Sequence, residues 1–401
     1  MKPASDGTDE KRGRMRITHV RTYLVHEKQR KNFIFVKLET DEGITGWGEA
    51  HTSLDMDTAV VGHLEQLSRY VIGYTPFNIK HFVQVACDDF AWRHGSLEFY
   101  SALSGIEMAM WDIVGKALKQ PVYNLLGGPC RPKIRVYANG WFYGAKAPAE
   151  HARAAEGTVK QGYTALKCYP FQKGSQLPAN RLYPPKEEMA RGVEIVRAVR
   201  DAVGPDTDLM VDVCRRLSPM QAVELAERIG EFKPYWFEEP CPIDNIDALA
   251  EIRSKTKIPI VTGETLYGKG QFVPVLEKRA ADILNPDACI VGGILEMKEI
   301  AAMAEPHYVA VSPHNFNSTV LAQAATVHVA ATMTNFLIAE CFVAFLEQGR
   351  RVARQLEVEG GYISLPEAPG LGVEIDEGAL AKYPYQQFDK RAFRTYRDEG
   401  P

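Results

Sequence analysis

Three acidic residues stand at equal intervals along this chain, and each closes a short apolar run. Asp212 lies in LMVDVC, Glu238 in YWFEEP and Glu264 in IVTGET, with 26 residues from each to the next. This interval is about the length of one strand-helix-strand repeat, so the three carboxylates would end neighbouring parallel strands at the same edge. Three hard oxygen ligands that leave positions for water and a bidentate substrate suit Mg²⁺ far better than zinc. A single acidic residue after a strand is more often a cap, but three in register predict a Mg²⁺ site.

Two further strand ends follow in the same phase. Asp287 lies in DILNPDA, 23 residues after Glu264, and His314 lies in VAVSPHNF, 27 residues further on. A neutral imidazole held by a carboxylate is fixed in one tautomer and becomes more basic, so this Asp and His can form a proton-abstracting pair. The alternative is a structural histidine beside a capping aspartate. The metal triad upstream favours the catalytic pair.

The chain changes its pattern near Ile134. Before it, residues 16–25, 32–40 and 43–50 read as antiparallel strands, and helical periodicity then runs from about Met56 to Leu126, ending at a Gly-Gly stop signal. After it, short apolar runs alternate with helical segments. The eight candidate strands are 134–138, 165–169, 209–213, 235–239, 259–263, 282–286, 309–313 and 336–340. Eight runs are what a (β/α)₈ barrel of the TIM type needs, and the candidate site lies at their carboxyl ends, where such barrels place active sites.

Composition is compatible with a large barrel and a second, smaller α+β domain. The chain has 401 residues, of which 45% are hydrophobic and 24% charged. We predict a disordered tail at 1–14, a capping domain at 15–130, an α/β barrel of seven or eight units at 131–355, and a C-terminal segment at 356–401.

Several classes of protein are disfavoured by the same data. No apolar stretch approaches about 18 residues, and the polar amino terminus lacks the apolar core of a secretory signal, so neither a membrane span nor export is expected. Seven scattered cysteines, an odd number, predict reduced buried thiols in a cytoplasmic protein. The net charge is −4 without a long basic run, so nucleic-acid binding is not indicated.

From about Met15 to Asp389, the sequence resembles the enolase superfamily and, within it, the mandelate racemase subgroup. The segments that resemble the family are SALSGIEMAMWDIVGKALKQPVYNLLGG (101–128), ALKCY (165–169), the three metal-ligand strands, the Asp287/His314 pair, Glu340 in FLIAECF and PGLGVEID (369–376).

The resemblance implies a chemistry for these residues. In such a site Mg²⁺ stabilises the enediolate that forms when a histidine or lysine base removes the proton next to a carboxylate. Lys167 falls where the family places a cation that contacts the substrate carboxylate, and Glu340 matches a carboxylate that could hydrogen-bond that group as an acid. A strand-end lysine that reaches solvent is the alternative for Lys167. The family also implies a homo-oligomer and a C-terminal segment that packs on the capping domain.

Two departures from the family pattern concern the reaction. Tyr169 stands where racemases of the subgroup carry a second lysine, so we predict His314 as the principal base and Tyr169 as a hydrogen-bond donor or secondary acid. Galactonate-dehydratase-like relatives carry Asp-x-His-x-Arg on the third strand; here Arg216 is retained and Cys214 replaces the histidine, and both are predicted to bind substrate. The general acid is therefore left open among His314, Tyr169 and Cys214.

Loops around the barrel mouth are expected to select the substrate. Residues 170–187 lengthen the loop after the second strand, and this insertion would either contact distal hydroxyl groups or form an oligomer contact. In the capping domain the loops 26–32, 51–55 and 93–100 approach the substrate by resemblance, with His51 and Arg93 as candidate binding residues. Their polar side chains fit a polyhydroxylated ligand better than a phenyl ring.

These observations predict a Mg²⁺-dependent carbon-oxygen lyase. It would remove the C2 proton of an aldonic or aldaric sugar acid, lose the C3 hydroxyl and yield a 2-keto-3-deoxy acid. The first alternative is a racemase, epimerase or cycloisomerase that shares the proton abstraction. The second, from another class, is a non-catalytic barrel that binds sugar acids as a scaffold.

Overall fold

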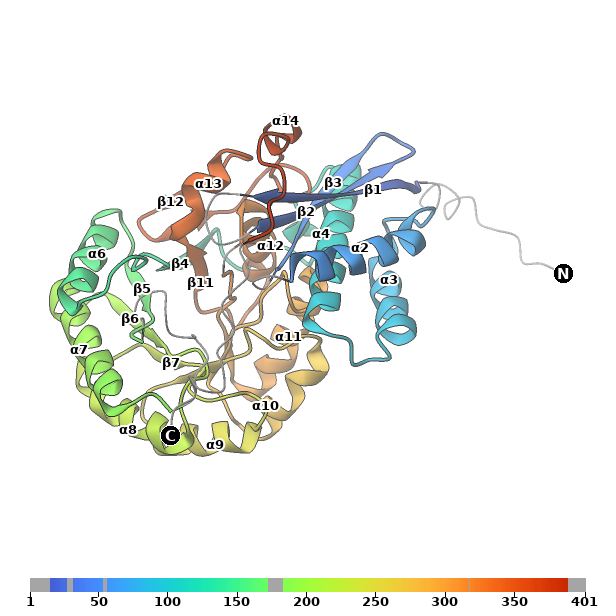
Figure 1. Cartoon of the computed structure of the whole chain (residues 1–401). Coiled ribbons are helices and arrows are strands. Elements are labelled where there is room, and N and C mark those ends of the chain that lie inside the picture. The colour runs from blue at the N-terminus through green and yellow to red at the C-terminus, as the bar shows by residue number, and fades with distance from the viewer. Residues whose placement is uncertain (1–14, 27–31, 53–55, 172–182, 317, 389–401) are drawn as a thin grey trace.

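The computed structural model describes residues 15–26, 32–52, 56–171, 183–316 and 318–388. The predicted tail at 1–14 and most of the 170–187 insertion lie outside these residues. Figure 1 shows a ring of strands surrounded by helices, with a smaller α+β layer packed at one side.

A closed barrel of parallel strands forms the larger part of the molecule. Its strands are β4 (Lys133–Asn139), β5 (Ala165–Cys168), β6 (Asp208–Asp212), β7 (Trp236–Glu238), β8 (Ile260–Thr262), β9 (Ile283–Leu284), β10 (Ala310–Val311) and β11 (Ala339–Phe342). They pair in chain order from β4 to β10. The ring closes because β11 pairs in parallel with β4, while Val311 bridges to Phe336 just before β11. The eight predicted strands are thus confirmed in place, the last of them shifted by about three residues.

Helices surround these strands (Figure 1). They are α6 (Pro148–Lys160), α7 (Lys186–Val203), α8 (Pro219–Ile229), α9 (Ile246–Lys255), α10 (Val273–Glu277), α11 (Ile294–Ala304), α12 (Val320–Ala331) and α13 (Leu346–Arg350). Helices α6 to α12 connect the strands, and α13 follows the last of them, β11. Local sequence starts several of them. Ser218 caps α8 and is followed by Pro219, and the side chain of Asn245 accepts a hydrogen bond from Ala248 to cap α9.

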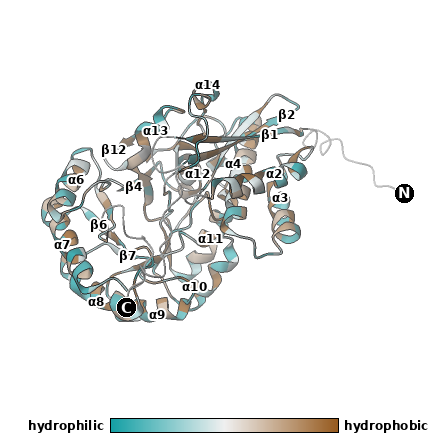
Figure 2. Cartoon of the chain, in the orientation of Figure 1, coloured by the Kyte–Doolittle hydropathy of each residue, from teal (hydrophilic) through white to brown (hydrophobic). Residues whose placement is uncertain are grey.

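Strand periodicity sorts the barrel interior into an apolar floor and a polar mouth. Because alternate side chains of a strand face the same side, Met210 and Asp212 both point inward on β6, as do Trp236 and Glu238 on β7. The first of each pair belongs to a buried apolar cluster that closes the barrel. Its members are Tyr137, Ala165, Met210, Trp236, Val261, Ile283 and Ile338. Figure 2 shows the outer helices with hydrophilic residues on their solvent side.

The smaller layer is an antiparallel sheet backed by helices. Its strands are β1 (Ile17–His26), β2 (Asn32–Thr40) and β3 (Thr45–Ala50), and its helices are α2 (Asp57–Val71), α3 (Ile79–Val85), α4 (Leu97–Leu118) and α5 (Val122–Leu125). Helix α4 lies directly on β3. A Cβ atom at Gly48 would lie 2.0 Å from the carbonyl oxygen of Gly105, so this close approach requires glycine.

The C-terminal segment contacts both parts. Its elements are β12 (Val358–Glu359), β13 (Tyr362–Ser364) and α14 (Glu377–Leu380). Strand β13 pairs antiparallel with β4 of the barrel. The Tyr23 hydroxyl on β1 donates to Glu377 at 2.6 Å, and the His26 amide donates to the carbonyl of Tyr383 at 3.1 Å. The fold is a TIM-type barrel with an α+β cap, as predicted, whereas the borders 15–130, 131–355 and 356–401 stay predictions.

Two further expectations concern cysteines and membranes. All seven cysteines are free, and four of them are buried, but Cys130 is exposed, contrary to the expectation of a buried thiol. Among the described helices, none has the length and apolar character needed to cross a membrane.

Candidate active site and metal centre

The three predicted metal ligands meet at the mouth of the barrel. Asp212 and Glu238 end β6 and β7 and are paired in register, and Glu264 follows β8 by two residues. One oxygen atom from each lies within 4.8 Å of the others, and all three side chains are buried. The carboxylates therefore fit a divalent cation that prefers hard oxygen donors.

Burial outweighs the neighbouring positive charges at two of the three carboxylates, Asp212 and Glu238, and disfavours their charged form. Burial raises the pKa of the Glu238 carboxyl to about 8, although the neighbouring Lys167 opposes this shift. Lys167 Nζ lies 2.6 Å from Glu238 Oε1, and Asn285 Nδ2 donates to the same oxygen at 3.1 Å. A bound divalent cation would add positive charge beside Asp212 and Glu238. At Glu264, burial is already outweighed by Arg215, His314 and Lys167, which lower its pKa well below the usual value.

The predicted His-Asp pair is present beside the triad. Asp287 follows β9, His314 follows β10, and His314 Nδ1 lies 2.7 Å from Asp287 Oδ2. The other ring nitrogen, Nε2, lies 3.2 Å from Glu264 and 3.5 Å from Glu340. Burial lowers the pKa of His314, but these three carboxylates raise it more strongly, so the net pKa lies well above the usual range. Nδ1 is held by Asp287, which leaves Nε2 facing the metal triad.

Lys167 is buried rather than solvent-exposed. Only 1% of its side chain is accessible, and its Nζ atom lies 3.3 Å from Glu340 Oε1 in addition to its contact with Glu238. Burial would raise the pKa of Glu340, but Lys167 and His314 outweigh it and lower the pKa below the usual value. This direction opposes the expectation that Glu340 acts as an acid. Asn139 and the backbone amide of Asn315 both donate to its oxygens.

Tyr169 and Cys214, the two departures from the family pattern, lie close to the triad. Burial raises the pKa of both Tyr169 and Cys214, so each keeps its proton at neutral pH. The Cys214 thiol donates to Asp212 Oδ2 at 3.4 Å. Arg216 hydrogen-bonds Tyr169 and is itself buried against Glu188 at 2.8 Å. Its guanidinium is therefore engaged in a protein ion pair, and a role in binding substrate remains a prediction.

His51 and Arg93, the two candidate binding residues of the capping domain, differ in burial. His51 is buried at the end of β3, and its amide donates to the carbonyl of Cys289 in the barrel at 3.5 Å. Arg93 is 78% exposed and paired with Asp88 on its own layer. Much of the predicted loops 26–32 and 51–55 lies outside the described residues, so their approach to substrate remains a prediction.

Sequence reasoning missed four polar residues that line the site. Asn139 and Asn285 are strand-end amides that hold Glu340 and Glu238, and their strand-end position was the available signal. Arg215 contacts Glu264 and Glu239, and Glu239 accepts from Thr262 and Gly263. No spacing rule predicts these contacts, because they cross between strands.

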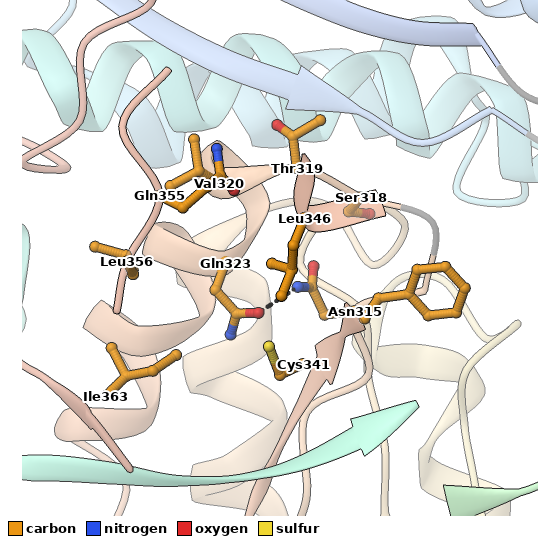
Figure 3. Close-up of a pocket in the computed structure, with 11 residues that line it drawn as sticks. Asn315, Ser318, Thr319, Val320, Gln323, Cys341, Leu346, Gln355, Leu356 and Ile363 are labelled. Carbon is orange, nitrogen blue, oxygen red and sulfur yellow. Dashed lines mark hydrogen bonds between the residues drawn. The ribbon is translucent and has the colours of Figure 1, made fainter. Parts of the chain in front are cut away.

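A small cavity is lined by Asn315, next to His314 in the chain, and by Gln323 of α12 (Figure 3). Asn315 Nδ2 donates to Gln323 Oε1 at 2.9 Å, and the second polar atom of each amide, Asn315 Oδ1 and Gln323 Nε2, has no hydrogen-bond partner among the described residues. Cys341 and Thr319 also line the cavity. Two buried polar atoms facing one small space suit an ordered water molecule.

Comparison with known proteins identifies the family of this chain. Residues 150–379 match the family described as enolase C-terminal domain-like, and residues 14–127 match the mandelate racemase / muconate lactonizing enzyme N-terminal domain. A solved structure of an enolase superfamily member from Salmonella Typhimurium superposes with a TM-score of 0.87 at 30% identity, covering 92% of this chain and 98% of that chain.

Three relatives have named activities. The D-gluconate dehydratase of Thermoproteus tenax is 34% identical, covering 87% of this chain and 69% of the relative. The D-galactonate dehydratase of Ralstonia pickettii is 33% identical, covering 91% and 94%. The D-galactarolactone cycloisomerase of Agrobacterium fabrum is 32% identical, covering 92% and 99%. With both family domains matched along most of its length, the chain belongs to the mandelate racemase / muconate lactonizing enzyme family of the enolase superfamily.

Proposed function

We propose that this chain is a Mg²⁺-dependent sugar acid dehydratase, a hydro-lyase that converts an aldonic or aldaric acid to a 2-keto-3-deoxy acid. The observation that carries the proposal is the convergence of the Asp212, Glu238 and Glu264 carboxylates with the His314–Asp287 pair at one barrel mouth. Relatives named D-gluconate and D-galactonate dehydratase support the substrate class.

The proposed ligands are Asp212, Glu238 and Glu264, whose oxygens favour Mg²⁺ over softer cations. When bound there, Mg²⁺ supplies positive charge to the substrate carboxylate and to the enediolate formed from it. In this proposal Lys167 adds a second positive charge near the same carboxylate. Asn139 and the Asn315 amide keep Glu340 oriented beside it.

His314 is the proposed base. Its Nε2 atom takes the C2 proton while Asp287 holds Nδ1 and stabilises the imidazolium that forms. The base must be neutral beforehand, and Glu264 is one of the carboxylates that raise its pKa. Because Glu264 is also a proposed metal ligand, its contact with His314 would weaken when its charge is shared with a cation.

Loss of the C3 hydroxyl needs a proton, and three groups are candidates to give it. His314 can return the proton it has taken, which balances the reaction as release of water. Tyr169, which keeps its proton because burial raises its pKa, is the second candidate and is held by Arg216. Cys214 is the weaker third candidate, because its thiol already donates to Asp212.

The test is turnover of a sugar acid library with Mg²⁺ in D₂O. We expect a keto product, detected with semicarbazide, from at least one aldonic or aldaric acid. Deuterium incorporation without a keto product would instead support an epimerase or racemase. Turnover of a sugar acid lactone but of no open-chain acid would support a cycloisomerase, the activity named for one relative. Binding of a sugar acid without deuterium incorporation and without any product would support the scaffold alternative.

Other features remain predictions from the sequence and the family. These are a homo-oligomeric assembly, a cytoplasmic location and the absence of a nucleic-acid partner. The role of the 170–187 insertion, as a substrate contact or an oligomer contact, is also a prediction.

A further inference from the structure

A fixed cation lies against the metal triad. The Nη1 group of Arg215 donates to Glu264 Oε1 and also lies 3.3 Å from Glu239 Oε2. Arg215 stands three residues after Asp212, and both it and Cys214 adopt left-handed backbone conformations, with φ of 63° and 45°. Non-glycine residues rarely take such conformations, and when they do the surrounding structure holds them there. Here the amide of Arg215 donates to the carbonyl of Glu239 at 2.7 Å.

Glu239 anchors this arginine. Its side chain is fully buried, and its Oε1 atom accepts from Thr262 Oγ1 at 2.8 Å and from the Gly263 amide at 3.0 Å. Glu239 is therefore bound to the end of β8, directly before the proposed ligand Glu264. Its second oxygen is left to Arg215, so the guanidinium is held beside the triad by a carboxylate outside it.

The consequence falls on Glu264. Its Oε1 atom accepts from Arg215, and its Oε2 atom lies 3.2 Å from His314 Nε2, so both oxygens already face positively charged or protonatable groups. A divalent cation that binds Glu264 must approach the guanidinium closely. Arginine stays charged at any physiological pH, so this repulsion is always present.

We propose that Arg215, held by Glu239, is a fixed counter-charge that lowers the affinity of the Asp212/Glu238/Glu264 site for its divalent cation. The inference rests on the metal site of the proposed function. It assigns to Arg215 a positioning and charge-tuning role, and it makes the Arg215–Glu239 pair a determinant of how tightly the site holds Mg²⁺.

The test is the dissociation constant of Mg²⁺ for the purified full chain, measured by titration calorimetry without substrate. Arg215→Met should bind Mg²⁺ at least about tenfold more tightly, because a positive charge a few ångströms from the cation is removed. Arg215→Lys, which keeps the charge, should stay close to the unmodified chain. Both readings are independent of catalysis.

A matched control exists at the opposite end of β6. Arg135 pairs with Asp208 at 2.8 Å, and its side chain is 27% exposed, against 26% for Arg215. Arg135→Met therefore removes the same charge and the same kind of ion pair far from the triad. We expect it to change the Mg²⁺ dissociation constant by less than about twofold.

Substitution of Glu239, which anchors Arg215, tests the opposite change in Mg²⁺ affinity. Glu239→Gln keeps an oxygen acceptor for Thr262 and Gly263 but removes a negative charge, so Mg²⁺ should bind more weakly. The double variant Arg215→Met/Glu239→Gln should bind more tightly than Glu239→Gln alone. This pair of variants also covers the case in which Arg215→Met alone fails to fold because Glu239 is left buried and unpaired.

The outcomes separate this inference from the proposed function. If the unmodified chain binds Mg²⁺ and removal of Arg215 leaves the affinity unchanged or weakens it in both backgrounds, the counter-charge role is refuted and the metal site stands. If the unmodified chain binds no Mg²⁺, the proposed metal site and this inference fail together.

Discussion

His314 Nδ1 lies 2.7 Å from Asp287 Oδ2, and this contact joins the ends of two neighbouring barrel strands. Asp287 and His314 each lie three residues after the end of their strand, β9 or β10, and form a parallel β-bridge with each other. The contact leaves Nε2 directed toward Glu264 and Glu340. The position of the proposed base is thus set by backbone pairing rather than by a flexible loop.

Replacing the base should abolish turnover while sparing the metal. We expect His314→Asn to lower kcat by roughly 10³-fold, since general base catalysis is removed, while Mg²⁺ affinity is retained. Steady-state kinetics and calorimetry measure the two quantities. His307→Asn, on an exposed turn, is the matched control. Substantial turnover by His314→Asn with intact Mg²⁺ binding would refute the assignment.

Removal of one metal ligand should cost both binding and activity. In the unmodified chain Mg²⁺ should raise the melting temperature, because it binds only the folded site. Asp212→Asn should lose this shift and fall roughly 10³-fold in kcat. Asp208→Asn is the control, because Asp208 begins the same strand and pairs with Arg135. An equal loss of the Mg²⁺ shift in both variants would contradict the assigned ligands.

The role of Tyr169 can be read from the two halves of the reaction. Burial keeps its hydroxyl protonated, so we expect it to assist departure of the C3 hydroxyl rather than proton abstraction. Tyr169→Phe should therefore exchange the C2 proton with solvent deuterium while forming keto product at least about tenfold more slowly. Tyr308→Phe, at an almost fully exposed tyrosine, is the control. Equal loss of exchange and product would assign Tyr169 to the first step instead.

Buried carboxylates join the cap to the barrel. Glu107 on α4 accepts from two backbone amides at the start of α11, and Glu49 is a second such residue. Glu49 on β3 accepts hydrogen bonds from the amide and hydroxyl of Thr319, at 2.9 and 2.6 Å, and from the amide of Ala322, all at the start of α12. Glu49→Ala leaves these donors buried and unpaired, which should lower the free energy of unfolding by about 3 kcal/mol. Urea denaturation measures this loss. The exposed Glu42→Ala should change it little, and equal losses would refute a specific joint.

Acid sensitivity should arise partly from a buried histidine in α12. His328 is neutral, because its Nδ1 accepts from the Tyr123 amide at 3.3 Å while Nε2 donates to the Leu371 carbonyl at 3.1 Å. Burial lowers the pKa of His328 to about 4, whereas an unfolded chain has a value near 6.5. Between these pH values only the unfolded state binds the proton.

The stability that neutral His328 contributes is therefore present above about pH 6.5 and is lost as the pH falls toward 4. In His328→Gln this part of the pH dependence should vanish. Between about pH 6.5 and 4 the unmodified chain should therefore lose up to about 3 kcal/mol more free energy of unfolding than the variant. Urea denaturation at several pH values measures it. Parallel pH profiles for the two proteins would contradict the role of His328.

Much of the site could be predicted from sequence because it follows strand periodicity. Asp212, Glu238 and Glu264 recur at the interval of one barrel unit, and parallel strands in register bring their carboxyl ends to one edge. The same logic placed Asp287 next to His314. The barrel strands and the three strands of the cap could be located for the same reason, since alternating or continuous apolar runs define strand positions.

Tertiary structure alone decided which charges meet across the barrel. Arg215 and Arg216 are adjacent in sequence, yet one guanidinium contacts the proposed ligand Glu264 while the other pairs with Glu188 on α7. A left-handed turn at Arg215 separates them, and no local pattern predicts such a turn in non-glycine residues. Long side chains reach several ångströms beyond their strand, so their partners depend on backbone geometry and on which strands are neighbours. Sequence spacing determined the proposed ligands and the proposed base, and only the closed barrel determined the cations beside them.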